Sequence, residues 1–418
     1  MQKNYDIIIV GSGIVGATAA LALAQTTRLN IALLDAKKIP DTFALAECGA
    51  RVSAISPASQ RIFKRLRSWQ GMAAKRVSPY RKMHVWDASS TGKMHIDCDA
   101  MQLPQLGHII EDDVIRASLV ESIKAFSNLD VIAPVQLAGL DVSAELATLT
   151  TGHGDVFSAK LIIAADGANS WLRAQAGITC KNHSYDHDAL VATVQTSLPH
   201  QQTAWQRFLT SGPLAFLPLS DPHTSSIVWS TNPAHAQELL ALNDEDFCLQ
   251  LSNAINHQLG DVVAASPRLS FNLQMRHANN YIKPRLALVG DAAHTIHPLA
   301  GQGVNLGLLD VACLVEIIGQ ALPGNRDYGS VATLRRYERW RKAENATMLA
   351  FVDGIKYLFV NDNKIIQSVR SLGLNLTDKM QFIKHFFANY AAGNRFNLPQ
   401  LASCQQADYS AKIAGLYK

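Results

Sequence analysis

The sequence predicts an α/β protein in which a Rossmann-like domain is interleaved with a mixed or antiparallel sheet and followed by C-terminal helices. Apolar segments at 6–10, 161–165 and 286–289 each lead into a glycine- or aspartate-rich turn, which is typical of strands buried on both faces of a parallel sheet. Residues 185–275 contain several strand-like segments in a row, punctuated by a helical stretch at 233–259. Consecutive strands without intervening helices indicate a second sheet in a different layer.

Length and composition fit a globular protein of two closely packed domains, because the chain has 418 residues, 48% of them hydrophobic and 17% charged. A net charge of +4 is small for this length, so we expect no nucleic-acid partner. No segment reaches the roughly 18 uninterrupted apolar residues of a membrane span, and the chain starts directly with a strand, so we expect a cytoplasmic protein without a signal peptide. Six cysteines without a CxxC pair argue against a metal site or a disulfide framework.

Residues 6–35 form a β-α-β pattern with a dinucleotide-binding fingerprint. The first strand is followed by Gly11, Gly13 and Gly16 in GxGxxG spacing, then by an Ala/Leu-rich helix and a second strand that ends in Asp35. The first glycine permits a tight turn, the second admits a pyrophosphate, and the third lets the helix pack on the strand. The helix N-terminus stabilises the pyrophosphate, and Asp35 is placed to bind ribose hydroxyls. A flavin is favoured, because no second fingerprint of this kind follows.

A second strand that ends at a carboxylate lies in the middle of the chain. The apolar residues from 161 lead into Asp166 and a short polar run, with Arg173 close behind. This arrangement places a carboxylate and free amides near a cleft, although a plain strand-to-helix turn would have the same pattern. Taken singly, the segment leaves both interpretations open.

A third segment, 285–310, combines a carboxylate with a glycine-rich helix start. Its strand ends in Gly290 and Asp291, and a loop then leads to Gly301 and Gly303, which open an apolar helix. A carboxylate at the end of a strand can hold hydroxyl groups, and the free N–H groups of a helix N-terminus can face a negative group. The segment therefore suits a sugar-phosphate or ring cofactor.

Together these segments resemble the three fingerprints of the FAD-dependent aromatic hydroxylases, the class A flavoprotein monooxygenases that include p-hydroxybenzoate hydroxylase. GSGIVG at 11–16, ADGANSWLR at 165–173 and GDAAHTIHPLAGQGVNLG at 290–307 occur in that family's order and at similar separation. RVSAIS at 51–56, LGHIIED at 106–112 and RRYERWRK at 335–342 look most like the ubiquinone-biosynthesis hydroxylases of the 2-octaprenylphenol or polyprenyl-methoxyphenol type. The similarity runs from about residue 5 to about residue 400.

The resemblance implies an FAD cradle built from these segments. Arg51 would lie near the isoalloxazine end, although its position alone favours an exposed or ion-paired arginine. Asp291 would meet the ribityl chain, and the helix start at 303–305 would face the flavin N1/O2 edge, where negative charge appears on reduction. The residues expected at the cofactor are Gly11, Gly13, Gly16, Asp35, Arg51, Asp166, Arg173, Gly290, Asp291, Pro298, Gly301, Gly303, Val304 and Asn305.

The same resemblance implies a division of the chain. Residues 1–70, 100–180 and 276–335 would form a discontinuous FAD-binding domain of the glutathione-reductase type. Residues 71–99 and 181–275 would form the substrate-binding sheet domain, and 336–418 a C-terminal helical region. The strand-rich part would supply the wall of a substrate pocket.

The activity implied is ring hydroxylation of a polyprenylated phenol. NADPH or NADH would reduce FAD, and O2 would add to give a flavin C4a-hydroperoxide whose distal oxygen is transferred to the ring. The sequence shows no convincing general base. His294 and His297 lie in the appropriate loop, but we favour histidines that fix the loop by hydrogen bonds, and no catalytic residue is assigned.

Two other functions stay open at this point: a flavin-dependent dehydrogenase or reductase on the same fold, and an FAD-binding component of a ubiquinone-biosynthesis protein complex. A basic run at 335–342 beside apolar residues 348–360 would suit peripheral contact with the inner face of a membrane. A solvated charged face over a core-packing helix is the favoured interpretation. The sequence does not distinguish the ring carbon or NADH from NADPH.

Overall fold

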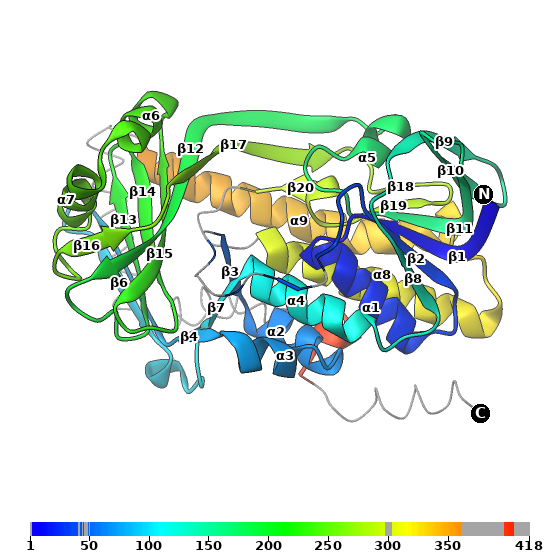
Figure 1. Cartoon of the computed structure of the whole chain (residues 1–418), viewed down its shortest axis with the longest axis horizontal. Helices are drawn as coiled ribbons and strands as arrows, with labels where there is room; N and C mark the ends of the chain where they lie inside the picture. Colours follow the sequence, from blue (N-terminus) through cyan, green and yellow to red (C-terminus); the bar gives the residue numbers. More distant parts are fainter. Residues whose placement is uncertain are drawn as a thin grey trace.

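The computed structural model of the chain describes residues 2–40, 42–43, 45, 49, 51–296, 303–360 and 397–404. Two sheets lie towards opposite ends of an elongated molecule, and long strands and one long helix run between them (Figure 1).

The first sheet has eight strands: β1 Gln2–Val10, β2 Ile31–Leu34, β8 Leu129–Ile132, β9 Leu137–Val142, β10 Ala147–Thr151, β11 Val156–Ala164, β18 Ile282–Lys283 and β19 Leu286–Leu288. Their order is β18-β19-β11-β1-β2-β8, and β10 joins β9 to β11. β19, β11, β1, β2 and β8 are parallel. The central strand ends are fully buried, as expected for a parallel sheet covered on both faces.

The second sheet has nine strands: β5 Lys82–Asp87, β6 Lys93–Asp97, β12 Cys180–Thr196, β13 Thr203–Leu209, β14 Gly212–Pro218, β15 Thr224–Thr231, β16 Val262–Ala265, β17 Leu269–Ala278 and β20 His294–Thr295. Their order is β20-β17-β12-β15-β14-β13-β5-β6, with β16 also paired to β12. All pairs are antiparallel except β13 with β5. A small third sheet contains β3 Val52–Ile55, β7 Gly107–Glu111 and β4 Ser78–Tyr80.

The helices are α1 Ile14–Thr26, α2 Pro57–Arg65, α3 Trp69–Lys75, α4 Asp112–Ile123, α5 Trp171–Gln175, α6 Pro233–Ala241, α7 Asp244–Ala254, α8 Gly303–Ala321 and α9 Val331–Val360. Short 3-10 turns are η1 Asp99–Met101, η2 Gly290–Ala292, η4 Leu322–Gly324 and η5 Gln400–Ala402. α1 packs against both α4 and α8 beside the parallel sheet. Because it has neighbours on several sides, its sequence is apolar all round rather than on one stripe.

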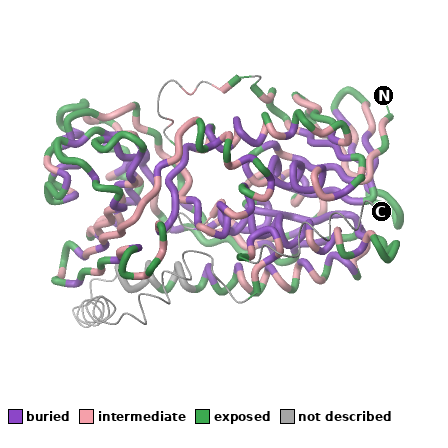
Figure 2. The backbone as a smooth tube through the Cα atoms, turned by 90° about the horizontal axis from the view of Figure 1, so that it is seen from below, coloured by how far each residue is buried: buried purple, intermediate pink, exposed green. Residues whose placement is uncertain are grey.

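One helical stretch, Gly303–Gly324, is long and apolar enough to cross a membrane by length and composition. Within the protein, 72% of its apolar window is buried. Figure 2 shows the buried backbone gathered in the interior, with exposed segments around the outside. The composition of α8 is therefore explained by its place in the core.

The predicted fold class is confirmed, with differences in detail. The helical stretch expected at 233–259 is two helices, because Asn232 and Asn243 each cap a new helix through their side chains. The first strand of the 185–275 segment belongs to β12, a long strand that begins before the segment, at Cys180. Five cysteines, at 98, 180, 248, 313 and 404, are free thiols.

Helices α6 and α7 cover one face of the second sheet. Leu251 of α7 is fully buried in the cluster between them and the sheet, whereas Leu249 on the same helix is 58% exposed. We expect Leu251→Ala to lower the free energy of unfolding by about 2–5 kcal/mol through the cavity it leaves. Leu249→Ala is the matched control, with an expected change within about 0.5 kcal/mol. Chemical denaturation of both variants checks this, and equal losses would contradict the assignment of the two faces.

Candidate functional site

The first glycine cluster has the close contacts that its sequence predicted. Gly11 has φ of +105°, and a Cβ there would lie 2.3 Å from the carbonyl oxygen of Ala165. A Cβ on Gly16 would lie 1.8 Å from the carbonyl oxygen of Gly11. Gly13, at the start of α1, has open space where its Cβ would be, and no side chain caps the helix. The helix N-terminus is therefore open to an anionic group.

Asp35 follows β2 and turns back onto this loop. One carboxylate oxygen accepts hydrogen bonds from the backbone N–H and the hydroxyl of Ser12, both at 2.6 Å, and the other accepts from the N–H of Lys37 at 2.8 Å. A carboxylate has about four acceptor positions, so one is still available for a ribose hydroxyl.

The middle segment and the Gly290–Asp291 turn are joined by Arg173. Its guanidinium donates to the carbonyl oxygens of Ala168 and Ala292, both at 2.8 Å. Asp166 accepts one hydrogen bond, from the N–H of Leu172 at 3.0 Å. Its other oxygen, Oδ1, is buried and has no hydrogen-bond partner in the described part of the chain. A buried carboxylate oxygen of this kind requires a donor, such as a ligand hydroxyl.

The third segment packs directly on the first. Gly290 has φ of +58°, and its missing Cβ would lie 3.1 Å from the side chain of Val15 in α1. Gly307 of α8 approaches both, since a Cβ there would be 2.7 Å from Val15 and 3.1 Å from the Cα of Gly290. The glycines thus bring η2, α1 and α8 together at one point.

Asp291, Arg51 and Asp112 form a charged group beside this point. Burial raises the pKa of Asp291, against the opposing effects of His294 and Arg51, and the nearby Asp112 raises it further. The side chain of Asp291 is nevertheless exposed, so it is densely surrounded by protein and still open to solvent, which is the environment of a recess. Arg51 lies 3.7 Å from the carboxylate of Asp112 and 5.4 Å from the ring centre of Phe271 in β17. It therefore stands between the glycine segments and the second sheet.

Asn305 ties the start of α8 to β3 and α2. Its Oδ1 accepts from the N–H of Ser56 at 2.9 Å and the hydroxyl of Ser59 at 2.7 Å, and its Nδ2 donates to the carbonyl oxygen of Ala54 at 2.7 Å. The side chain is 2% exposed. Asn305 therefore fixes the helix start in place, which leaves the backbone N–H groups there to face a ligand.

Asp310 is the centre of a fully buried network that the sequence did not reveal. Its carboxylate accepts from the N–H of Gly290 at 3.1 Å, from Nε2 of His294 at 2.5 Å, from Nε of Arg341 at 2.8 Å and from Nδ2 of Asn345 at 3.1 Å. The side chains of this network, which belong to Asp310, His294, Arg341 and Asn345, are each at most 1% exposed. In the sequence, the one indication of this network was Asp310 itself, an aspartate in the mainly apolar sequence of α8.

The charges in this network determine the protonation of Asp310. Burial alone would raise its pKa, but the charges of His294 and Arg341 and their hydrogen bonds outweigh burial and lower the pKa to about 2. Asp310 is thus ionised, and Nε2 of His294 carries the proton of their hydrogen bond. The interpretation of His294 as a loop-fixing residue agrees with this geometry, whereas His297, Pro298 and Gly301 lie outside the described residues.

The side chain of Glu111, the last residue of β7, is engaged within the protein. It is 4% exposed and receives hydrogen bonds from the N–H of Gly49 at 2.7 Å and from Nη2 of Arg76 at 2.9 Å. The second Arg76 contact, from Nε to Glu111, is 2.8 Å long. Its side chain is therefore held within the protein by the Arg76 ion pair.

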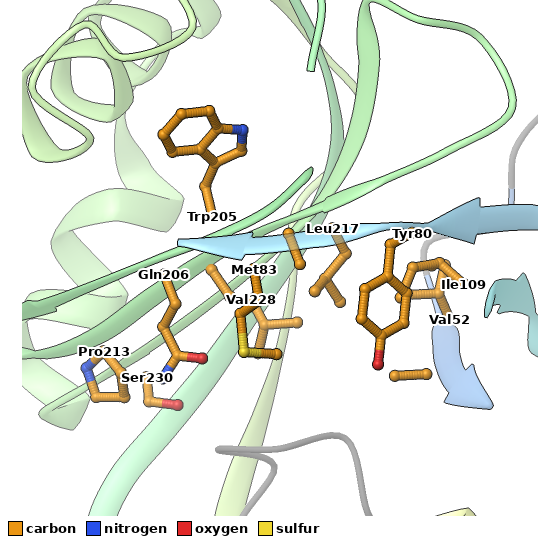
Figure 3. Close-up of a pocket in the computed structure, with 13 residues that line it drawn as sticks. Val52, Tyr80, Met83, Ile109, Trp205, Gln206, Pro213, Leu217, Val228 and Ser230 are labelled. Carbon is orange, nitrogen blue, oxygen red and sulfur yellow. The ribbon is translucent and has the colours of Figure 1, made fainter. Parts of the chain in front are cut away.

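A cavity of about 120 Å³ lies between the second sheet and the small third sheet (Figure 3). It touches the glycine segments through β3, because Ala54 lines it and also accepts the hydrogen bond from Asn305. The lining is mainly apolar. It consists of Val52, Ala54, Tyr80, Met83, Ile109, Ala204, Trp205, Gln206, Pro213, Ala215, Leu217, Val228 and Ser230.

The arrangement fits a bound dinucleotide with an organic ring beside it. The open N-terminus of α1 suits a pyrophosphate, and the unpartnered Oδ1 of Asp166 and the accessible Asp291 suit hydroxyl groups. The apolar cavity next to α8 suits an aromatic substrate.

Replacing Asp310 by asparagine tests the buried network. We expect Asp310→Asn to cost about 3–5 kcal/mol in unfolding free energy, because it leaves the fully buried Arg341 with Glu344 as its one remaining carboxylate partner among the described residues. Asp327→Asn is the control, since Asp327 pairs with Arg285 but its side chain is 43% exposed, and we expect a loss on the order of 1 kcal/mol. Similar losses in urea denaturation would show that Asp310 is not the hub.

The pH dependence of the unfolding free energy tests the same network. The pKa of Asp310 is lower in the folded protein than in an unfolded chain, where an aspartate has a pKa of about 3.9. Its contribution is therefore present above about pH 4 and lost as pH falls towards 2. From about pH 5 to pH 1, we expect the wild type to lose about 2–3 kcal/mol more than Asp310→Asn. Parallel curves for the two proteins would contradict the assignment.

Known proteins match nearly the whole chain. Residues 4–352 match the family described as an FAD binding domain. The ubiquinone biosynthesis monooxygenase COQ6 of Xenopus tropicalis is 34% identical over 441 residues, which cover 93% of this chain and 93% of the relative. The 3-demethoxyubiquinol 3-hydroxylase of Escherichia coli is 36% identical over 392 residues, covering 94% of this chain and 99% of the relative.

Solved structures share the fold at lower identity. p-Nitrophenol 4-monooxygenase PnpA from Pseudomonas putida superposes with a TM-score of 0.77 at 15% identity, covering 95% of this chain and all of that one. HpxO of Klebsiella pneumoniae, solved with FAD and uric acid, gives 0.72 at 18% identity, covering 94% and 97%. The sequence matches and the geometry agree, and the chain belongs to the FAD-binding family of aromatic-ring hydroxylases, among the ubiquinone-biosynthesis monooxygenases.

Proposed function

We propose that this protein uses FAD, NADPH or NADH, and O2 to hydroxylate the aromatic ring of a polyprenylated phenol in ubiquinone biosynthesis. The observation that carries the proposal is the convergence of three glycine-rich segments next to an apolar cavity of about 120 Å³. When bound, FAD supplies the chemistry that activates O2 with electrons from the nicotinamide. The protein supplies binding, orientation and a water-poor pocket for the ring.

Each segment is assigned a part of FAD. Gly11, Gly13 and Gly16 would let the pyrophosphate approach α1, and Asp35 would use its remaining acceptor position on the ribose. Asp291 would hold the ribityl hydroxyls. Its raised pKa does not prevent this, since a carboxyl group accepts hydrogen bonds in either protonation state.

The ring end of the cofactor would lie between α8 and Arg51. The backbone N–H groups of Gly303, Val304 and Asn305 start α8, where the positive end of the helix dipole stabilises negative charge on the flavin. Arg51 adds a positive charge on the side of the second sheet. Pro298 and Gly301 are assigned to the same region from the family resemblance.

Asp166 and Arg173 would serve the cofactor and the nicotinamide together. Arg173 holds the middle segment against η2, and the buried Oδ1 of Asp166, which has no partner among the described residues, would accept a hydrogen bond from the cofactor. The described residues include no separate nicotinamide domain, and the nicotinamide would therefore visit the cleft transiently. We keep the division of the chain into FAD-binding and substrate-binding segments that the sequence predicted.

The prenyl tail of the substrate must lie outside the ring cavity. Because the substrate is apolar, it must be delivered from a membrane or by a partner protein. The basic run of α9 is split by the fold, because Arg341 is buried while Arg335 and Arg339 are exposed. The exposed members are available for a peripheral contact with the inner face of a membrane, and a ubiquinone-biosynthesis complex is the alternative source. We favour a cytoplasmic protein that meets its apolar substrate at such a surface.

The proposed function is tested by turnover with 2-prenylphenol under 18O2. We expect NAD(P)H oxidation stimulated by the phenol and one labelled oxygen atom in the product. Turnover without label would instead indicate a dehydrogenase or reductase. Bound flavin without stimulated turnover would favour a structural role in a complex.

Asp291→Ala checks the cofactor assignment. Loss of a charged hydrogen-bonding group costs about 1.5–3 kcal/mol, so we expect FAD affinity to fall roughly 10- to 150-fold. Flavin absorbance of the purified protein and titration with FAD measure this change. Asp261→Ala is the control, because Asp261 is exposed and pairs with His257. Normal FAD affinity in Asp291→Ala would refute the role of Asp291.

A further inference from the structure

The cavity beside β3 is too small for a prenylated molecule as a whole. Its volume of about 120 Å³ is close to that of a cavity of about 150 Å³ that holds one benzene molecule. It therefore accepts one aromatic ring, and the tail must leave it. Features of the cavity wall then decide which ring is accepted.

Polar groups stand at two ends of this otherwise apolar cavity. Figure 3 shows Tyr80 at one end and Gln206 with Ser230 at the other, while Met83, Leu217 and Val228 lie between them. The indole of Trp205 lies on the other side of its strand, where it joins the core under α6 and α7. Among the described residues that line the cavity, those at its two ends are therefore the ones that present hydrogen-bonding side chains to a ring.

The placement of these groups follows from the sheet registers. Gln206 pairs with Ala215, which pairs with Val228, so all three point to the same face of the second sheet. Ser230, two residues beyond Val228, points to that face as well. Tyr80 comes from the third sheet opposite Gly107, where a Cβ would lie 2.8 Å from Cε1 and 2.9 Å from the hydroxyl of Tyr80. The lack of a side chain at residue 107 leaves room for the tyrosine ring.

None of these three side chains has a hydrogen-bond partner among the described residues, and all three line the cavity. An unsatisfied polar group in an apolar environment costs about 1–3 kcal/mol. Burial raises the pKa of Tyr80 to about 12, so its hydroxyl keeps its proton at neutral pH and can donate. Groups of this kind in an apolar pocket fix the orientation of a ligand.

We propose that Tyr80 at one end and Gln206 with Ser230 at the other select a phenol ring that carries oxygen substituents on opposite sides. This inference rests on the proposed function and adds its substrate class. A ring with a single oxygen would satisfy one end and leave the other unpaired. A ring with two opposed oxygens would satisfy both, with the apolar side chains packed against its faces. The preferred substrate is therefore an already oxygenated phenol.

The test compares two synthetic probes, 2-prenylphenol with one ring oxygen and 4-methoxy-2-prenylphenol with two opposed ring oxygens. In the wild type we expect kcat/KM to be about tenfold higher for the methoxy probe, which corresponds to one hydrogen bond. Tyr80→Phe and Gln206→Leu should each lower kcat/KM for the methoxy probe about tenfold. Only one of the two variants should affect the probe with a single oxygen.

Ser225→Ala is the matched control, because Ser225 lies on β15, as Ser230 does, but on the other face of the sheet. We expect both of its kcat/KM values to stay within about twofold of wild type. Flavin content and thermal unfolding confirm that each variant is folded. The inference is overturned if both site variants affect both probes equally, as general damage to packing would, or if either leaves the methoxy probe unchanged. Failure of the proposed function looks different, since no probe would then acquire oxygen.

Discussion

The ionised carboxylate of Asp310 is the interaction on which the rest of the site depends. It collects donors from η2, β20 and α9 while lying within α8, so that four segments distant in sequence share one charge. An uncompensated charge at this depth would be costly, and His294 and Arg341 together offset it by their charges and hydrogen bonds. The turn that carries Asp291 is thereby fixed to α8 through the hydrogen bonds of Gly290 and His294 to Asp310.

A second set of contacts joins the cofactor side to the substrate side. Asn305 connects the first turn of α8 to β3, and β3 forms part of the cavity wall. Arg51, directly before β3, lies over Phe271 of the second sheet. Because the same short strand contacts both α8 and the cavity, the ring-binding pocket and the helix that would face the flavin are positioned together. This arrangement suits catalysis that depends on holding two rings in a defined relation.

The two sheets contribute differently to function. The parallel sheet is buried on both faces and supplies strand ends at which glycines and carboxylates meet. The antiparallel sheet buries one face under α6 and α7 and leaves the other face for a ligand. Variation on that free face changes the pocket without disturbing the core beneath it. Under the proposed function, most residues that contact the substrate ring would therefore come from a different sheet than those that hold the cofactor.

The sequence by itself determined the fold class, the glycine cluster and the carboxylates at the strand ends. These features depend on local geometry: Gly11 needs a positive φ, and Gly16 must let α1 approach the preceding loop. It did not reveal the network of Asp310, Arg341 and Asn345, the ion pair of Glu111 with Arg76, or the cavity with Tyr80 and Gln206. Their partners lie far apart in the chain, and only the packing of helices and sheets brings them together. A buried arginine in a basic run has no local signature, because its environment is created by tertiary contacts.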